Sequence, residues 1–392
     1  MANTLTALAP VLFSAARVVA EEPVGALGSI SMNFDDKGVA LGDSIVIPDA
    51  PVAAETDYSA AMTTTGGTDK IAGSVAVTIQ YSKQTSWNLT GEQIRSLQNA
   101  QSDKEWAKQM VAQGMRTLRN AAEVRLCAAI TAGASRACGT AGTTPFASSL
   151  DAIADVQKIM LDNGAPMADP YLIINTKALN NAEKLTVVQQ AYAAGSDQER
   201  RQGIIGNQYG FRIKASAGVQ LHTNGAGTGY QANGALTQYG VTLALDSGTV
   251  NTTGLVAGDV IRFGTGGGSG TGADYDTNYV INTGLVATSG NIVISRPGML
   301  VARVDNDVMT TQGGAGGTYT PNIAFERNAI VGIMRPPLIP ASPLINQLKI
   351  SDDKGLTYLL CEVVGDGMIT WRLHLCYGFK VINGEFVAIL MG

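Results

Sequence analysis

The feature that most constrains this chain is an unbroken helical pattern over residues 102–134, "SDKEWAKQMVAQGMRTLRNAAEVRLCAAITAGA". Ser102 and Glu105 have the spacing of a capping box at its start. A helix of roughly 30 residues, at about 1.5 Å per residue, is about 45 Å long, which exceeds the usual helix of a globular domain. The sequence therefore predicts a spine helix at about 103–132, with an apolar face formed by Trp106, Met110, Met115, Leu118, Ala122 and Leu126.

The residues before this helix indicate two projecting segments. At the N-terminus Leu5, Leu8, Leu12, Ala15 and Val19 recur at helical spacing, and such a short amphipathic arm needs a neighbour to bury its apolar stripe. Residues 28–48 contain two extended runs around the turn "DDKG", and residues 49–69 have no core periodicity. The pattern predicts a long projecting hairpin, or else a disordered excursion.

The middle of the chain predicts a mixed α/β body followed by a β-rich part. A helix is expected in 148–166, with Ser148 or Ser149 as N-cap, and "YLIINTKALNNAEKL" and "GFRIKAS" follow as strand, helix and strand. After about residue 225, glycine, threonine and asparagine separate short β runs, which include "DVIRF", "NYVIN", "NIVIS" and "MLVARV". "TGLVAGDVIRF" and "TGLVATSGNIVIS" echo each other, as similar hairpins in a small barrel would.

The composition bounds the class of protein. Charged residues make up only 15% of the 392 residues, glycine accounts for 46, and the formal net charge is -5. This composition suits a surface largely covered by copies of the same chain, although a glycine-rich secreted protein would look similar. It argues against a general nucleic-acid binder, which needs clustered lysine and arginine.

The cysteines and the N-terminus point to assembly inside a cell. The spacings of the four cysteines match no CxxC metal or redox pattern, so we expect isolated buried thiols. The N-terminal stretch lacks a basic region followed by a long apolar run, so we expect neither a signal peptide nor a membrane span. The cysteines are Cys127, Cys138, Cys361 and Cys376.

One glycine-rich loop, "GTGGGSGTGADYD" at 264–276, matches a nucleotide-binding pattern. Gly268, Gly270 and Ala273 satisfy G-x-G-x-x-A, but a β-like run follows where a dinucleotide fold requires a helix N-terminus. Asp274 and Asp276 would repel a pyrophosphate. The sequence therefore predicts a loop that joins the strands "DVIRF" and "NYVIN", and it contains no GxxxxGK[ST].

No catalytic, cofactor-binding or metal-binding residue is predicted. His222 and His374 are the two histidines, and neither HExxH nor GxSxG is present. His374 and Cys376 would share one face of a strand, where a nucleophilic pair is conceivable but core packing is favoured. The remaining charged pairs are interpreted as turns, Asp35-Asp36 and Asp352-Asp353, and as a solvated or subunit-facing patch, Arg200-Arg201.

The order of these elements resembles the major capsid proteins of tailed double-stranded DNA phages. More narrowly, short stretches spread over nearly the full length are similar to podovirus-type coat proteins that carry an inserted domain. These stretches are "MANTLTALAP", "WNLTGEQ", "ASRACGTAGTTPF", "LDNGAP", "TYTPNIAFERNAIV" and "CYGFKVINGE".

The resemblance implies an α+β, Hong-Kong-97-type capsid fold with a β-rich inserted domain. Some members of the wider fold cross-link a lysine to an asparagine, but podovirus-type members are not expected to, and we assign no role to Lys37 or Lys70. The implied domains are an N-terminal arm at 1–27, an E-loop at 28–70, a P domain with the spine helix at 71–165, a first part of the A domain at 166–225, the insert at 226–320, and the A domain return with C-terminal strands at 321–392.

The same resemblance implies partners and a location. The chain would form hexamers and pentamers of an icosahedral shell, usually on a scaffolding protein and with a portal. A decoration protein is a further possible partner, and packaged double-stranded DNA would contact the inner surface without sequence specificity. The shell would be assembled in the bacterial host cytoplasm, with no cofactor and no membrane. An encapsulin-like nanocompartment shell and a secreted glycine-rich surface-layer protein remain as alternatives, with a Cys/His enzyme third.

Overall fold

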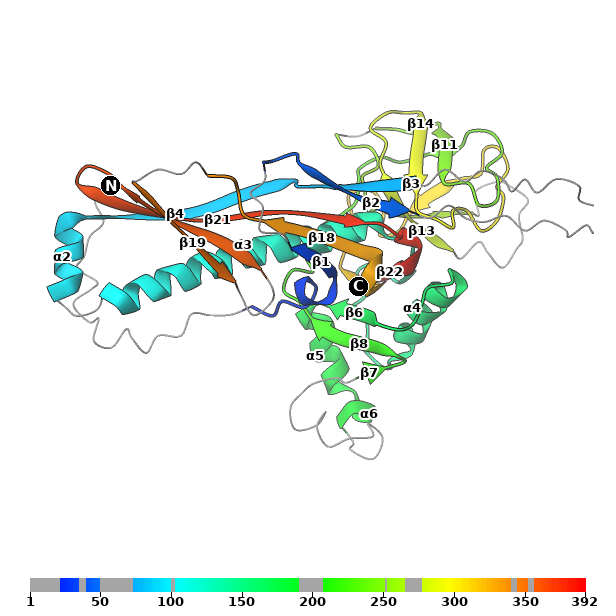
Figure 1. Cartoon of the computed structure of the whole chain (residues 1–392). Coiled ribbons are helices and arrows are strands. Elements are labelled where there is room, and N and C mark those ends of the chain that lie inside the picture. The colour runs from blue at the N-terminus through cyan, green and yellow to red at the C-terminus, as the bar shows by residue number, and fades with distance from the viewer. Residues whose placement is uncertain are drawn as a thin grey trace, which may run out of the picture.

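The computed structural model describes residues 22–34, 40–49, 73–99, 103–189, 207–250, 252–264, 277–339, 344–351 and 356–392. In these residues the molecule is elongated, with a long flat arm at one end and a compact head at the other (Figure 1). A single helix, α3 (Asp103–Gly133), runs along the arm and ends in the head. The prediction of a spine helix at about 103–132 is confirmed, while Ser102 and the side chain of Glu105 lie outside the described residues.

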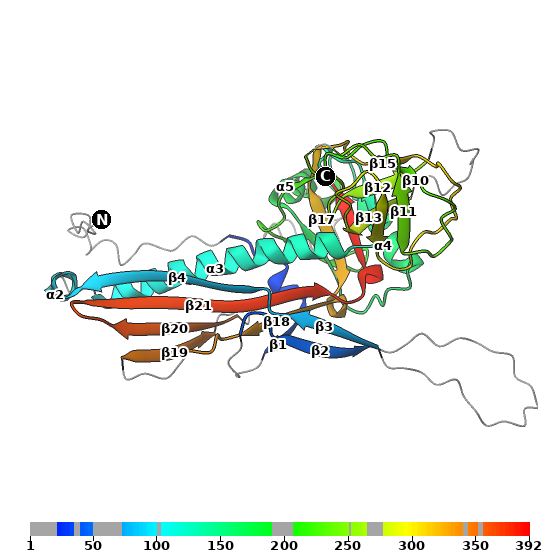
Figure 2. The ribbon, with the colours of Figure 1, turned by 90° about the horizontal axis from the view of Figure 1, so that it is seen from above.

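The arm is a six-stranded sheet, and α3 covers one of its faces (Figure 2). The strands follow the order β1-β18-β21-β20-β19, and β4 pairs with β21 on its other side. Buried side chains of α3 pack against alternate residues of the 14-residue strand β21, namely Leu373, Leu375 and Tyr377. The strand bounds are β1 (Ser31–Phe34), β4 (Tyr81–Thr90), β18 (Ile330–Arg335), β19 (Ile345–Ser351), β20 (Thr357–Val364) and β21 (Met368–Val381).

The head is built on a 12-stranded sheet between two helical layers. Ile173 and Phe325 face the C-terminal half of α3, whereas Leu172 and Leu390 face α4 (Asp151–Asp162) and α5 (Thr176–Lys184). In sheet order the strands of this part are β5 (Arg136–Gly139), β22 (Val387–Met391), β17 (Pro321–Glu326), β6 (Pro170–Ile174), β8 (Phe211–Ala215) and β7 (Asn207–Gln208). The three central strands, β22, β17 and β6, are buried along their whole length, as expected for strands covered on both faces.

The β-rich part, for which the sequence predicts short strands, forms a small barrel with its own apolar core. Its strands follow the order β10-β11-β14-β13-β12-β15, and a bridge between Gln231 and Val308 brings β15 back to β10. β13 also pairs with β5, so the barrel shares a strand with the sheet of the head. Its strands are β10 (Gln231–Ala232), β11 (Thr242–Asp246), β12 (Val260–Phe263), β13 (Asn278–Thr283), β14 (Gly290–Ile294) and β15 (Met309–Thr311).

The two "TGLVA" copies pair with each other. Leu255 N–H donates to Leu285 O at 2.8 Å, and Leu285 N–H donates to Leu255 O at 2.9 Å. A Cβ at Gly254 would lie 2.0 Å from Leu285 O, and one at Gly284 would lie 2.1 Å from Leu255 O. The echo in the sequence therefore reflects two backbones in close mutual contact, which only glycine permits.

Three local predictions are wrong. "MLVARV" at 299–304 does not form a strand, because its only β-bridge is the isolated one between Arg303 and Leu236. The N-cap of α4 is Leu150, which makes no side-chain cap bond, and Ser149 instead contacts the Asp151 carboxylate at 2.8 Å. The two runs in 28–48 do not pair with each other. β1 lies parallel to β18 in the arm sheet, and β2 (Ser44–Asp49) pairs with β3 (Gly73–Thr78).

Candidate assembly surface

The projecting hairpin consists of β2 (Ser44–Asp49) and β3 (Gly73–Thr78), which pair over six residues each. Figure 2 shows this hairpin directed away from the arm. Its base packs on the body through Val77, Ile79, Ile333 and Cys376. Gly378 allows this approach, because a Cβ there would lie 2.0 Å from Thr78 O. The base is therefore fixed, while most of β2 and β3 is exposed or half-buried.

The arm exposes apolar side chains at an edge of its sheet. β19 is the last strand in the sheet order of the described residues, and among them only β20 pairs with it. Leu344 and Leu348 are each 59% exposed there, and Leu338 is 75% exposed. An edge strand with exposed large hydrophobic residues is a surface suited to contact with another chain.

A buried carboxylate anchors the first described residues to the spine helix. Glu123 accepts hydrogen bonds from the N–H groups of Gly25, Ala26 and Leu27 at 2.9, 2.7 and 2.9 Å. It also accepts the Ser216 hydroxyl at 2.6 Å. Glu123 is not identifiable from the sequence, because a glutamate in an amphipathic helix gives no local sign of a partner almost 100 residues away.

Glu22 forms a second contact of the same segment with α3. Arg116 Nε lies 2.8 Å from Glu22 Oε2, and Asn120 also donates to this carboxylate. The hydrogen bonds from Arg116 and Asn120 lower the pKa of Glu22 to about 2. The segment 22–27 therefore lies along α3, held by Arg116 and Glu123 one after the other.

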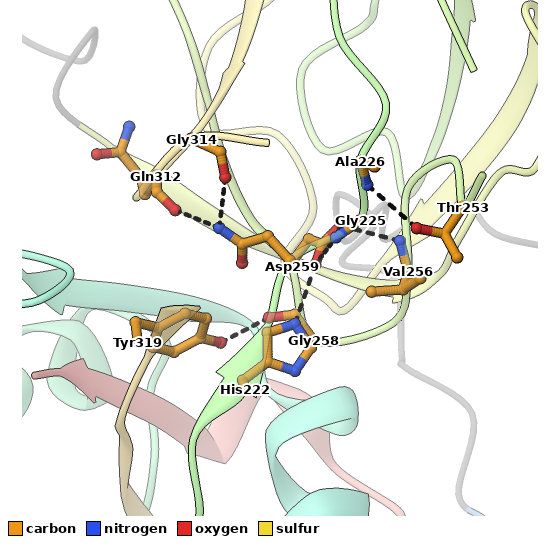
Figure 3. A network of polar contacts seen from close by, with 11 residues as sticks. His222, Gly225, Ala226, Thr253, Val256, Gly258, Asp259, Gln312, Gly314 and Tyr319 are labelled. Atoms are coloured by element: carbon orange, nitrogen blue, oxygen red, sulfur yellow. Dashed lines mark hydrogen bonds and ion pairs between the residues drawn. The ribbon is translucent and has the colours of Figure 1, made fainter. Parts of the chain in front are cut away.

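The two histidines lie in different places, and neither has the geometry of a catalytic pair. His222 Nε2 lies 2.9 Å from Oδ1 of the fully buried Asp259, which also accepts Val256 N–H at 2.9 Å (Figure 3). Tyr319 packs on the His222 ring and donates to Gly258 O at 2.6 Å, and burial raises the pKa of Tyr319.

This network closes the base of the barrel. His222 belongs to β9 (His222–Thr223) and Tyr319 to β16 (Thr318–Tyr319), which pair where the chain enters and leaves the β-rich part. A cavity of about 210 Å³ beside His222 is also lined by Cys127, but burial raises the pKa of this thiol and keeps it protonated. The arrangement positions two strands and offers no activated nucleophile.

His374 and Cys376 share one face of β21, as expected, but they do not form a reactive pair. The Cys376 thiol contacts the Ser82 hydroxyl at 3.3 Å. Burial lowers the pKa of His374 and raises that of Cys376, so both side chains are favoured in their neutral forms. The four cysteines are free thiols, of which Cys127, Cys361 and Cys376 are buried.

Other residues from the sequence analysis lie outside the described part of the chain. Residues 265–276 of the glycine-rich loop are among them. The strands on either side of this loop, β12 and β13, do pair antiparallel, as predicted. Within the described residues, no group of three histidine, cysteine or carboxylate side chains could hold a metal, and no helix is long and apolar enough to cross a membrane. The positions outside are Leu5, Leu8, Leu12, Ala15 and Val19 of the predicted N-terminal arm, and Asp35, Asp36, Lys37, Lys70, Arg200, Arg201, Gly268, Gly270, Ala273, Asp274, Asp276, Asp352 and Asp353.

Comparisons with known proteins give structural likenesses only. No protein-family model matches the chain, and no curated protein matches its sequence. The capsid structure of the cyanophage P-SCSP1u is similar at a TM-score of 0.49 and 12% identity, over 96% of this chain and 90% of that chain. A structure from mycobacterium phage Che8 gives 0.45 and 13%, over 89% and 84%. The mature capsid of bacteriophage PhiM1 gives 0.44 and 13%, over 93% and 85%.

Proposed function

We propose that this chain is the major capsid protein of a tailed double-stranded DNA phage, with a Hong-Kong-97-type fold of the podovirus type. The observation that carries the proposal is the arm: a long sheet covered on one face by a single helix, with a projecting hairpin and an edge strand at which Leu348, and Leu344 just before the strand, are exposed. Nearly all described residues of the hairpin strands and of β19 are exposed or half-buried in the single subunit. Neighbouring copies would supply the missing contacts, and the low charge of the chain fits a surface covered in this way.

The domain assignment follows the same order along the chain. Residues 1–27 are the N-terminal arm, 71–165 the P domain around α3, and 166–225 the first part of the A domain. Residues 321–392 are the A domain return and the C-terminal strands, of which β18 to β21 lie in the arm sheet. The pairing of β9 with β16 supports an inserted domain at 226–320, because the chain leaves the body and returns to it at adjacent strands. The E-loop is better defined by the β2–β3 hairpin and the residues between its two strands than by the whole range 28–70. The reason is that β1, within that range, belongs to the arm sheet.

Assembly would produce hexamers and pentamers of an icosahedral head. Each interface can be modest, because closed symmetry repeats it many times and makes the assembled shell far more stable than one contact. A scaffolding protein and a portal would guide closure, a decoration protein is a possible later partner, and the enclosed DNA would be held without sequence specificity. We place this assembly in the host cytoplasm.

Electron microscopy of the purified recombinant chain tests the proposal. We expect shells, tubes or capsomers, formed alone or with the scaffolding protein of the same genome. A chain that stays monomeric under all assembly conditions contradicts it. The contents of particles isolated from infected cells provide the second criterion, because a phage head encloses double-stranded DNA and a nanocompartment encloses protein.

A further inference from the structure

An apolar groove lies at the end of the arm that is farthest from the head. It has a volume of about 280 Å³ and lies between α2 (Gly91–Asn99), the first turns of α3 and the arm sheet. All three tryptophans of the chain line it, and Trp87 and Trp371 are direct cross-strand neighbours. We call it the Trp groove; its lining residues are Trp87, Leu89, Ile94, Leu97, Trp106, Ala107, Val111, Leu360 and Trp371.

The first described residues, followed back from Leu27 to Glu22, lead toward the Trp groove. From Leu27 back to Glu22, the contacts on α3 move from Glu123 to Arg116, that is, toward the N-terminus of the helix. Val111 is five residues and Trp106 ten residues farther in the same direction. These separations correspond to about 7.5 and 15 Å along the helix axis. Glu22 is therefore bound within about 15 Å of the groove residues of α3 along the helix axis, and 21 residues precede it in the sequence, enough to span this distance.

The sequence of that segment has the chemistry that the groove requires. Leu5, Leu8, Leu12, Ala15 and Val19 form one apolar stripe at helical spacing. A groove lined by aromatic and aliphatic side chains binds such a stripe by removing apolar surface of both partners from water.

We propose that residues 5–19 of the same chain dock into the Trp groove. The segment is then held at two successive places: Arg116 and Glu123 fix residues 22–27, and the groove buries the apolar stripe before them. The docking takes place within the single subunit. It does not depend on the proposed capsid function, because it concerns contacts within one chain.

Tryptophan fluorescence gives a direct test, since every tryptophan of the chain lines the groove. The full-length double variant Leu8→Asp with Leu12→Asp is compared with Thr6→Asp with Ser14→Asp, which places the same charges off the apolar stripe. In dilute, unassembled subunits we expect the first variant to emit at longer wavelength and to be quenched several-fold more strongly by acrylamide. The control variant should match the wild type. Equal spectra for both variants and the wild type overturn the proposal.

Photo-crosslinking locates the segment without destabilising the subunit. A photoreactive amino acid at position 12 of the full chain should form crosslinks to α2 near Ile94 or to α3 between Trp106 and Val111, and one at position 14 should form few of them. Mixing isotopically labelled and unlabelled subunits identifies the chain of origin. Crosslinks between differently labelled chains would assign the groove to a second copy, and crosslinks elsewhere would leave it without this occupant; either result overturns the proposal.

Discussion

The carboxylate of Glu123, in the middle of α3, accepts the backbone N–H of Ala26 at 2.7 Å, although the two residues are 97 positions apart. Gly25 and Leu27 donate to the same carboxylate, which thereby satisfies three N–H groups at the start of the short helix Leu27–Ser29. Unpaired buried donors are costly. Glu123 thus determines where the N-terminal segment joins the body.

Replacement of Glu123 should destabilise the subunit more than replacement of an exposed glutamate. In Glu123→Ala three backbone N–H groups and the Ser216 hydroxyl lose their acceptor. We expect the free energy of unfolding to fall by about 3 kcal/mol or more, measured by urea denaturation of unassembled subunits. Glu92→Ala, at the exposed start of α2, is the control. A change of less than about 0.5 kcal/mol in Glu123→Ala, as for an ordinary surface substitution, would contradict the anchoring role.

The contact between Glu22 and Arg116 should be sensitive to acid. Because the pKa of Glu22 falls from 4.5 to about 2 in the folded chain, the stabilisation is complete above pH 4.5 and is lost as the pH falls toward 2. We expect Glu22→Gln to be less stable than the wild type at pH 7 and to approach it at pH 2 to 3. The measurement is urea unfolding of both proteins at several pH values. A stability difference that is independent of pH would show that the charge of Glu22 is not responsible.

The contact between the two "TGLVA" copies should not tolerate a side chain at Gly254. In Gly254→Ala the new Cβ would meet Leu285 O at 2.0 Å, so the two backbones must separate. We expect a loss of about 1–3 kcal/mol, as for other overpacked sites. Faster hydrogen exchange in β12 to β14 but not in α4 would locate the effect in the barrel. Gly91→Ala is the control, since nothing lies within 4 Å of its added Cβ, and equal exchange in both variants would contradict the prediction.

The hairpin should be required for assembly and dispensable for folding. Residues 50–72 connect β2 to β3, whose base is fixed by Val77 and Ile79. We expect a chain with a short glycine-serine turn in their place to remain folded by circular dichroism but to form no closed shells in electron micrographs. A similar replacement of residues 265–276, between β12 and β13, is the matched control and should still assemble. Intact shells from the first variant would show that the hairpin is not an assembly element.

A deletion of the whole range 28–70 would be a poorer test. It would remove β1, which pairs with β18 over four residues in the arm sheet. It would also remove Ser29, whose hydroxyl donates to Gly25 O at 2.7 Å in the anchored segment. Loss of shells in such a variant could follow from a damaged body alone.

The sequence by itself determined the elements whose pattern is local. The periodic apolar face of α3, the strand and helix at 170–184, and the antiparallel strands around the glycine-rich loop all follow from neighbouring residues. The absence of a helix after those glycines likewise removed the nucleotide-binding interpretation. Such features depend on backbone propensity and on side-chain spacing within a few turns, which one sequence contains.

Only the tertiary structure decided which distant residues meet. It placed β1 beside β18, joined Glu123 to Ala26 and His222 to Asp259, paired the two "TGLVA" copies, and gathered the three tryptophans at one end of the arm. The physical reason is that each of these contacts gains its free energy from burial of both partners at once. Apart from the repeated "TGLVA", neither partner, taken alone, carries a periodicity or a motif that identifies the other.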